Sequence, residues 1–163
     1  MSSALYAGSF DPFTFGHLSV VMAAAEIFGS VAVVIAKNPS KEYLFSAEER
    51  VDQIKSVLNG FKSLKDKVVV TSYDGYTVDA AKFMEASVLI RGIRDASDVE
   101  YEMSIAELNS ALEPSIRTVF LPGNRTLSNV SSSEVKRRFE AGESIGFYCP
   151  PQIIRAMKDK KGA

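Results

Sequence analysis

The chain has very little of the two side chains that most often carry covalent or metal chemistry. Among its 163 residues there is one cysteine, Cys149, and one histidine, His17. A single cysteine excludes an internal disulfide framework and fits a reducing compartment. No second histidine stands ready to activate Cys149, so we interpret it as a small buried or incidental thiol rather than a nucleophile.

Long apolar runs and an excess of one charge are also missing. No run approaches the roughly 18 apolar residues that a membrane-spanning helix needs, and the N-terminus lacks the basic and apolar blocks of a signal peptide. Nineteen Lys and Arg balance twenty Asp and Glu, for a formal charge of −1. This balance predicts neither a nucleic-acid nor a membrane partner, and we expect a cytoplasmic protein in which any anion site comes from local clustering.

Short β-branched runs alternate with segments of helical spacing along the chain. The runs at 5–7, 31–36, 68–72, 88–90 and 118–121 predict buried strands, and the segments 17–28, 47–61, 78–84, 99–112, 132–141 and 151–160 predict helices. Ser46, Ser97 and Ser131 each precede a glutamate by three residues, which is the form of a capping box. We predict one α/β domain over residues 1–163: a Rossmann-like, doubly wound, parallel five-stranded sheet with helices on both faces and C-terminal helices.

Ligands of such sheets bind outside the carboxyl ends of the strands. The segments that follow the five predicted strands are 9–17, 37–41, 73–77, 91–94 and 122–133. They bring a histidine, lysines, arginines and several hydroxyls to one edge of the sheet. The sequence therefore predicts an anion site at this edge.

The first of these segments carries the most specific pattern. Gly8-Ser-Phe-Asp-Pro-Phe-Thr-Phe-Gly-His17 follows an apolar strand and opens a helix. Such a turn offers free backbone N–H groups and the positive end of a helix dipole to a phosphate chain. Thr14 is suited to capping the helix, His17 can point a donor at the same phosphates, and we interpret Asp11 as turn chemistry. An enzyme acting on a nucleotide is the leading hypothesis.

Other charged and hydroxyl residues each allow two interpretations. Lys41 is either a solvated loop lysine or a ligand-binding cation. Arg91 and Arg94 form either a surface salt-bridge cluster with Asp95 and Asp98 or a pair of forks onto phosphate oxygens, and their place at a strand end favours the second. The serines at 131–133 can cap a helix and also form a phosphate nest. Neither a Gly-x-Gly-x-x-Gly fingerprint nor a Walker A motif is present, which argues against a dehydrogenase or a P-loop NTPase.

Together these motifs resemble a known family. The run from Gly8 to Pro12, with Thr14-x-Gly-His17, resembles the signature of the nucleotidyltransferase superfamily. The segments 38–41 (Asn-Pro-Ser-Lys), 91–94 (Arg-Gly-Ile-Arg), 100–103 (Glu-Tyr-Glu-Met) and 131–133 (Ser-Ser-Ser) resemble bacterial phosphopantetheine adenylyltransferases, over nearly the whole chain. The resemblance implies transfer of the adenylyl group of ATP to 4′-phosphopantetheine, giving dephospho-coenzyme A and pyrophosphate.

The resemblance also implies residue roles, position by position. His17 stabilises the transition state, with Lys41 as a second catalytic cation. The residues implied to bind ATP are Ser9, Phe10, His17, Gly92, Ile93, Arg94, Glu102, Leu127, Ser128, Asn129, Val130, Ser131, Ser132 and Ser133. Those implied to bind the acceptor are Ser9, Lys41, Thr77 and Arg91. Magnesium, a homohexamer and feedback inhibition by coenzyme A belong to the same implication, and no protein metal site is expected.

The chain departs from the family pattern at three places, and two other functions compete with the leading one. Phe15 stands where a polar residue is usual, Thr77 stands where a larger apolar one is common, and residues 123–129 lack an aromatic. A nucleotidyltransferase with cytidylyl or nicotinamide-mononucleotide specificity would share His17 but not the pattern of Arg91, Arg94 and Glu102. A non-catalytic nucleotide sensor would not need His17 at the α-phosphate.

Overall fold

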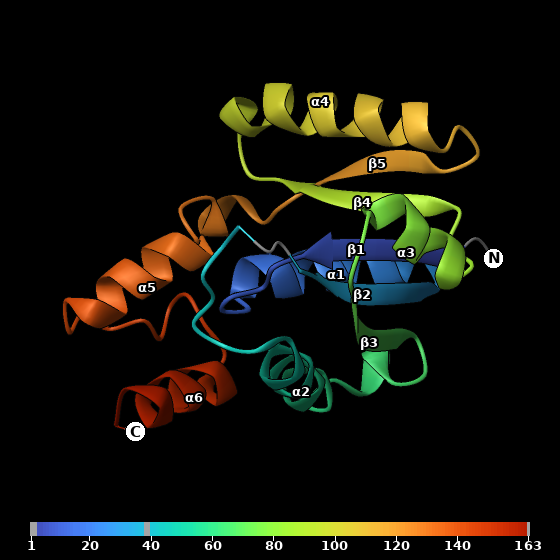
Figure 1. The fold of residues 1–163 in the computed structure, drawn as a ribbon. Coiled ribbons are helices and arrows are strands. Elements are labelled where there is room, and N and C mark those ends of the chain that lie inside the picture. Colours follow the sequence, from blue (N-terminus) through green and yellow to red (C-terminus); the bar gives the residue numbers. More distant parts are fainter. Residues whose placement is uncertain (1–2, 38–39, 163) are drawn as a thin grey trace.

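A computed structural model describes residues 3–37 and 40–162 and contains one sheet of five strands (Figure 1). Asn38 and Pro39, which belong to one of the motifs above, lie outside the described residues. The strands are β1 (Ser3–Gly8), β2 (Ser30–Ala36), β3 (Val68–Tyr73), β4 (Val88–Ile93) and β5 (Arg117–Pro122). All neighbours are parallel, in the order β3-β2-β1-β4-β5, which confirms the predicted doubly wound sheet.

The strand order reverses direction between β1 and β4. The chain winds from β1 through β2 to β3 on one side, then returns to the other side of β1 to form β4 and β5. Residues 4–6 of β1 pair with β2 on one side and with β4 on the other; Ala4, for example, pairs with both Val31 and Val88. The carboxyl ends of β1 and β4 therefore flank the crevice in which open α/β sheets bind their ligands.

Helices cover both faces of the sheet, and alternate strand residues face each layer. Ala4 and Tyr6 of β1 pack in the larger core, with α1 (Phe15–Phe28), α2 (Ala47–Leu58) and α6 (Pro151–Gly162). Leu5 and Ala7 face the smaller core, with α3 (Thr77–Phe83) on the opposite side of the sheet. Burial on both faces explains why the strands are continuous apolar runs instead of alternating ones.

Polar residues fix the starts of several helices, and the start expected for one of these helices is wrong. Thr14 caps α1, and Ser46 forms a complete capping box with Glu49 at the start of α2. The N-cap of α4 (Ala96–Leu112) is Asp95, whose carboxylate accepts the N–H of Ser97. A carboxylate two residues earlier thus satisfies the first turn, and the helix begins before the capping box that was predicted at Ser97.

The C-terminal helices fold back on the rest of the molecule. A short 3-10 turn and the helix α5 (Ser132–Glu140) follow β5, and α6 then packs against α2 (Figure 1). Lys160 of α6 pairs with Glu49 of α2, and its ammonium group lies 5.8 Å from the centre of the Phe45 ring. The described residues include no helix that is long and apolar enough to cross a membrane.

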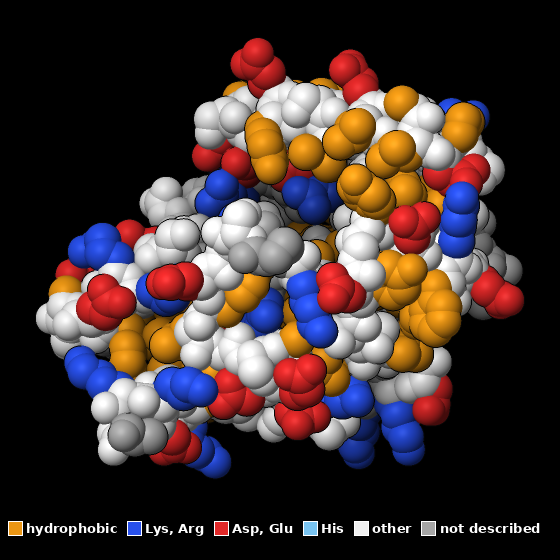
Figure 2. Space-filling view, in the orientation of Figure 1, with side chains coloured by type: hydrophobic (Ala, Val, Ile, Leu, Met, Phe, Trp, Pro, Cys, Tyr) orange, Lys and Arg blue, Asp and Glu red, His pale blue; other side chains and the backbone are white. Residues whose placement is uncertain are grey.

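The helix α4 differs from the others because most of its apolar side chains are exposed. It lies beside β5 at the edge of the sheet, and hydrophobic side chains gather along it and toward α3 (Figures 1 and 2). The large exposed apolar residues on these two helices and the turn before α3 are Tyr76, Phe83, Val99, Tyr101, Met103, Leu108 and Leu112. Asn109 is the one buried residue of α4. This patch is larger than scattered surface apolar residues account for and indicates an interaction surface.

Candidate active site

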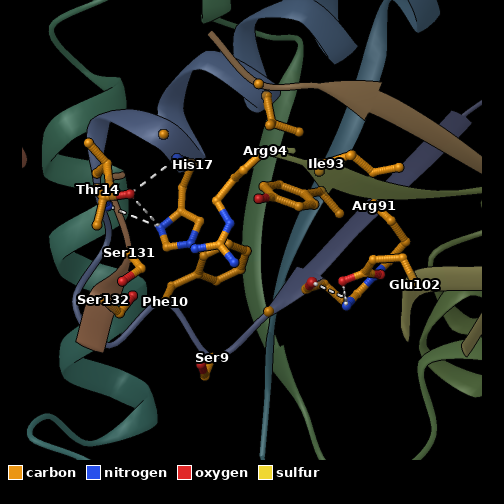
Figure 3. A pocket seen from close by; sticks show the side chains of 18 of the residues that line it. Ser9, Phe10, Thr14, His17, Arg91, Ile93, Arg94, Glu102, Ser131 and Ser132 are labelled. Carbon is orange, nitrogen blue, oxygen red and sulfur yellow. Dashed lines mark hydrogen bonds and ion pairs between the residues drawn. The ribbon is translucent and has the colours of Figure 1, made fainter. Parts of the chain in front are cut away.

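A cavity of about 650 Å³ opens at the carboxyl ends of β1 and β4, at the point where the strand order reverses (Figure 3). It has two walls. Residues 8–17, which run from the end of β1 into α1, form the β1–α1 wall, and residues 91–102, from the end of β4 into α4, form the β4–α4 wall. The segment before α5 and the exposed Lys41 contribute to the rim. The sheet edge predicted to bind an anion therefore contains a real cavity.

Most of the residues expected at the site line this cavity. They are Ser9, Phe10, His17, Lys41, Thr77, Arg91, Gly92, Ile93, Arg94, Glu102, Leu127, Val130, Ser131 and Ser132. Ser128, Asn129 and Ser133 do not line it. Ser133 is exposed within the first turn of α5, so the expected nest of three serines contributes two of its members to the cavity.

The β1–α1 wall is tightly packed around Phe10. This residue has a φ of +48°, in the left-handed region, and its ring is 2 % exposed. The ring makes edge contacts with Tyr6, Phe13 and His17, at centroid distances of 5.2, 5.8 and 5.0 Å. A Cβ at position 8 would lie 2.9 Å from the Phe10 ring, so Gly8 has to be glycine for this packing to form. Such backbone strain persists where surrounding contacts over-determine it.

His17 is held in one orientation and one tautomer by Thr14. The backbone N–H of Thr14 donates to Nδ1 of His17 at 3.1 Å, and the N–H of His17 is accepted by Oγ1 of Thr14 at 3.3 Å. Because a backbone N–H can only donate, Nδ1 is the acceptor and carries no proton. The neutral ring therefore has its proton on Nε2, and the ring lies against the cavity beside Phe10 and Arg94 (Figure 3).

His17 is neutral at physiological pH. Burial, together with the positive charge of Arg94, lowers the pKa of His17 from 6.5 to about 4. Both causes disfavour the imidazolium, the first because a charge loses its water and the second because like charges repel. In the free protein His17 is thus a hydrogen-bond donor through Nε2–H and not a stored positive charge.

The β4–α4 wall holds its cations with carboxylates. Arg91 donates through Nε and Nη2 to the two oxygens of Glu102, at 2.5 and 2.9 Å, and through Nη1 to the carbonyl of Ala7 at 3.4 Å. Burial disfavours the charged guanidinium, but the hydrogen bond and charge of Glu102 outweigh it and raise the pKa of Arg91. Arg91 therefore remains a fixed cation at the end of β4.

Arg94 forms a second, more exposed pair. Its Nε and Nη2 donate to the two oxygens of Asp98 at 3.0 and 2.8 Å, and the hydrogen bond raises the pKa of Arg94 and lowers that of Asp98. Of the salt-bridge cluster considered as the alternative to phosphate binding, the pair of Arg94 with Asp98 is present, whereas Arg91 pairs with Glu102 and Asp95 caps α4. An exposed ion pair contributes less than about 1 kcal/mol, so a phosphate can replace Asp98 at little cost.

Two hydroxyls at the start of α5 complete the site. Ser131 caps α5 by accepting the N–H of Glu134, and Ser132 donates to the carbonyl of Pro12 at 2.8 Å. This bond joins the C-terminal third of the chain to the β1–α1 wall. The capping role predicted for Ser131 is confirmed, while the carboxylate of Glu134 turns to Arg137 and Arg138 instead of closing a capping box.

Sequence reasoning missed the support that two buried charged residues give to the β1–α1 wall, Asp11 from within it and Arg50 from behind it. Asp11, interpreted as turn chemistry, is 2 % exposed, and its carboxylate accepts the N–H groups of Leu44 and Phe45 at 2.8 and 3.0 Å. Arg50, also 2 % exposed, donates to the carbonyl of Ser9 at 2.7 Å. Arg50 could have been found, because it falls in phase with the apolar stripe of its helix, four residues before Ile54.

Comparison with known proteins agrees with this architecture. The model of the cytidylyltransferase-like family matches residues 5–138. Two solved structures of a bifunctional NMN adenylyltransferase/ADP ribose pyrophosphatase from Francisella tularensis, one complexed with AMP and a manganese ion, superpose with TM-scores of 0.73 and 0.75. Each is 19 % identical to this chain. The superpositions include 99 % of this chain and 49 and 50 % of the two solved chains, so this chain spans about half their length. The fold is that of a nucleotidyltransferase.

Curated relatives show which family of nucleotidyltransferases the chain belongs to. The phosphopantetheine adenylyltransferase of Prochlorococcus marinus (strain MIT 9301) is 41 % identical over 155 residues, which are 95 % of this chain and 96 % of the relative. That of Allorhizobium ampelinum (strain ATCC BAA-846 / DSM 112012 / S4) is 38 % identical over 161 residues, 98 % of each chain. The chain belongs to the phosphopantetheine adenylyltransferase family.

Proposed function

We propose that this enzyme transfers the adenylyl group of ATP to 4′-phosphopantetheine, giving dephospho-coenzyme A and pyrophosphate. Family membership over nearly the whole chain supports the reaction. The observation that carries the proposal is the division of the cavity between two walls at the sheet's switch point. One wall presents the neutral imidazole of His17 close to Arg94, and the other presents Arg91, with Lys41 and Thr77 lining the same cavity.

The reaction needs no base and no covalent intermediate. The phosphate of the acceptor is already an anionic nucleophile; one of its oxygens forms a bond to the α-phosphorus of ATP, and the bond from that phosphorus to the bridging oxygen of the β-phosphate breaks. Pyrophosphate leaves with the electron pair of that bond. Catalysis of such an in-line transfer consists of positioning and of stabilising charge as it develops.

The two walls divide this work. Nε2–H of His17 donates to the α-phosphate as negative charge builds up, and Lys41 adds a mobile positive charge at the rim. Arg94 gives up its hydrogen bonds to Asp98 and binds the ATP phosphates instead. Arg91 binds the acceptor phosphate from the end of β4, and the remaining groups of the ATP subsite align the triphosphate with it.

Magnesium fits this site as a companion of ATP. Within the described residues there is no cluster of three or more His, Cys, Asp or Glu that could cage a metal ion, and Glu102, the acidic side chain lining the cavity, has both oxygens bonded to Arg91. Magnesium keeps much of its water shell and commonly binds to substrate phosphates, so this donor set suits it. When bound, the ion would supply positive charge to the departing pyrophosphate.

The test is to offer the protein ATP, magnesium and a panel of phosphorylated acceptors, and to identify the adenylylated product by mass spectrometry. We expect dephospho-coenzyme A and pyrophosphate in equal amounts when 4′-phosphopantetheine is the acceptor. Nicotinamide mononucleotide and glycerol 3-phosphate serve as the matched alternatives. Preferential turnover of either one would contradict the proposal, and binding of ATP without any product would favour a nucleotide sensor.

Three further properties belong to the same proposal. The exposed apolar patch on α3 and α4 supports self-association of this chain, in our proposal to a homohexamer. Coenzyme A contains the whole of the product, both its phosphopantetheine and its adenylyl parts, so it would occupy the same cavity and act as a feedback inhibitor. We place the enzyme in the cytoplasm. Sedimentation equilibrium, coenzyme A titration and fractionation test these three properties in turn.

A further inference from the structure

Arg50 is a buried cation behind the β1–α1 wall, outside the set of residues that line the cavity. Its Nε donates to the carbonyl of Ser46 at 3.1 Å and its Nη1 to the carbonyl of Ser9 at 2.7 Å, while its guanidinium lies 4.2 Å from the centre of the Tyr43 ring. No carboxylate of the described part of the chain forms an ion pair with it, although its positive charge is one of the causes that lower the pKa of Glu48. Burying an arginine without an ion pair is costly, which calls for a function.

The carbonyl of Ser9 and the N–H of Phe10 belong to one peptide unit. This unit is trans, so the two groups point in opposite directions. A guanidinium that holds the carbonyl toward α2 therefore turns the N–H of Phe10 away from α2, to the side of the cavity. Within residues 3–37 and 40–162, this N–H donates no backbone or side-chain hydrogen bond. No acceptor in the described part of the chain occupies it, so we take it as available to a ligand.

The bond from Arg50 also makes that N–H a stronger donor. A charged donor on the carbonyl oxygen withdraws electrons from the amide and polarises its N–H, as in any chain of cooperative hydrogen bonds. Phe10 holds the left-handed φ that this peptide orientation requires, and its ring is locked by Tyr6, Phe13 and His17. The peptide thus stands as a fixed, polarised donor close to His17.

We infer that Arg50 is a positioning residue, which orients and polarises the Phe10 N–H as an anion donor for the ATP phosphates. The inference rests on the proposed function, because it takes ATP as the ligand of the β1–α1 wall. It assigns a second donor to the wall that holds His17. Unlike Arg91 and Arg94, Arg50 acts through a backbone amide and never touches the substrate.

Kinetics of two Arg50 variants test the inference, with a variant of the same helix as control. Arg50→Gln removes the charge, and Arg50→Lys keeps it but loses the fork. Ile54→Ala, at a fully buried position one turn further along, lowers stability without removing a hydrogen bond to Ser9. We expect Arg50→Gln to lose about tenfold or more in kcat/KM for ATP beyond Ile54→Ala, with the KM for phosphopantetheine nearly unchanged and Arg50→Lys intermediate. Equal kinetic losses in Arg50→Gln and Ile54→Ala would overturn the inference.

A direct readout separates this inference from the proposed function. Labelling phenylalanine with ¹⁵N gives ten amide signals in the native enzyme, and a Phe10→Leu variant identifies the one of interest. The Phe10 amide should shift on addition of magnesium and ATP in the native enzyme and lose that response in Arg50→Gln. An amide that ignores ATP in an enzyme that turns over phosphopantetheine would overturn the role of Arg50 alone. If phosphopantetheine is not turned over, the proposed function falls, while the amide response to ATP still decides the role of Arg50.

Discussion

The two walls of the cavity are built in different ways. The β1–α1 wall is packed and hydrogen-bonded in place: Phe10 is buried by three aromatic neighbours, and His17 is fixed by two bonds to Thr14. The β4–α4 wall carries charges that are paired with carboxylates, Arg91 with Glu102 and Arg94 with Asp98. A preorganised donor serves the transition state, whereas an ion pair that exchanges partners serves binding. Substitutions in the two walls should therefore act on different kinetic constants.

The largest effect on catalysis should come from a substitution in the packed β1–α1 wall. His17→Ala should lower kcat by about a hundredfold or more, because it removes one preorganised donor from the transition state. ATP affinity, measured by calorimetry, and the melting temperature should change little. A variant with near-native kcat would remove His17 from the mechanism, and a loss confined to ATP affinity would place His17 with the binding groups of the other wall.

The next largest effects, on substrate affinity, should come from the charged β4–α4 wall, and they should differ between its two arginines. Arg91→Ala should chiefly weaken phosphopantetheine and Arg94→Ala chiefly ATP, each by about 1.5–3 kcal/mol for the loss of a charge-assisted fork. Lysine should rescue either position poorly, because a point charge cannot bind two oxygens side by side. Separate calorimetric titrations of each variant with each substrate measure this division.

Asp98 offers a control for the same wall. Asp98→Ala releases Arg94 without removing it, so ATP affinity should stay equal or rise. If both arginine variants weaken both ligands alike, or neither ligand, the arginines form a structural cluster and the assignment of this wall is wrong.

A smaller effect, on stability, should follow from the buried carboxylate that ties the packed wall to the segment before α2. Asp11→Asn should lower the free energy of unfolding by about 1.5 kcal/mol, because an amide keeps one of the two oxygens that accept the N–H groups of Leu44 and Phe45. Urea denaturation measures the loss. Asp52→Asn, at an exposed position of α2, is the matched control and should stay within about 0.5 kcal/mol of the native value.

The smallest effect concerns the protonation of His17 in the β1–α1 wall and should leave activity at neutral pH unchanged. A proton NMR titration of the chain's single histidine should give a pKa of about 4 in the folded protein, against about 6.5 in urea. Below pH 6.5 the unfolded chain binds a proton that the folded chain refuses, so this group makes the fold less stable as the pH falls toward 4. Folded His17 titrating near 6.5, or carrying its neutral proton on Nδ1, would contradict the geometry at Thr14.

For the β1–α1 wall, the sequence predicted the Thr14–His17 motif better than the residues that hold this motif in place. Thr14 and His17 were predictable because a cap, a glycine turn and a histidine follow one another within a few residues, and local hydrogen bonds fix them. Asp11 was not predictable, since its partners lie more than thirty residues away at Leu44 and Phe45 and nothing near Asp11 signals them. The start of α4 was misplaced because two carboxylates and a serine compete as caps within four residues, and only the backbone angles decide between them.

The same limit applies to the charged wall. The placement of Arg91 and Arg94 at a strand end predicted that both would line one cavity, and they do. Their ion pairs depend on the direction in which α4 leaves the sheet, which decides whether Glu102 returns over Arg91. Sequence spacing does not contain that direction. Whether Ser128, Asn129 and Ser133 contact ATP stays a prediction.

The bonds that hold the β1–α1 wall differ in how early in synthesis they can form. Ser132 bonds to Pro12 across 120 residues, and the N–H of Phe15 is accepted by the carbonyl of Tyr148 at 2.9 Å. A ribosome releases the N-terminal signature first; its bonds to Leu44, Phe45 and Arg50 can form early, whereas those to Ser132 and Tyr148 have to wait until the last fifth of the chain has emerged. A nascent chain that stops after β5 therefore has all five strands of the sheet but lacks the bonds to Ser132 and Tyr148, and it lacks Ser131 and Ser132 of the cavity lining.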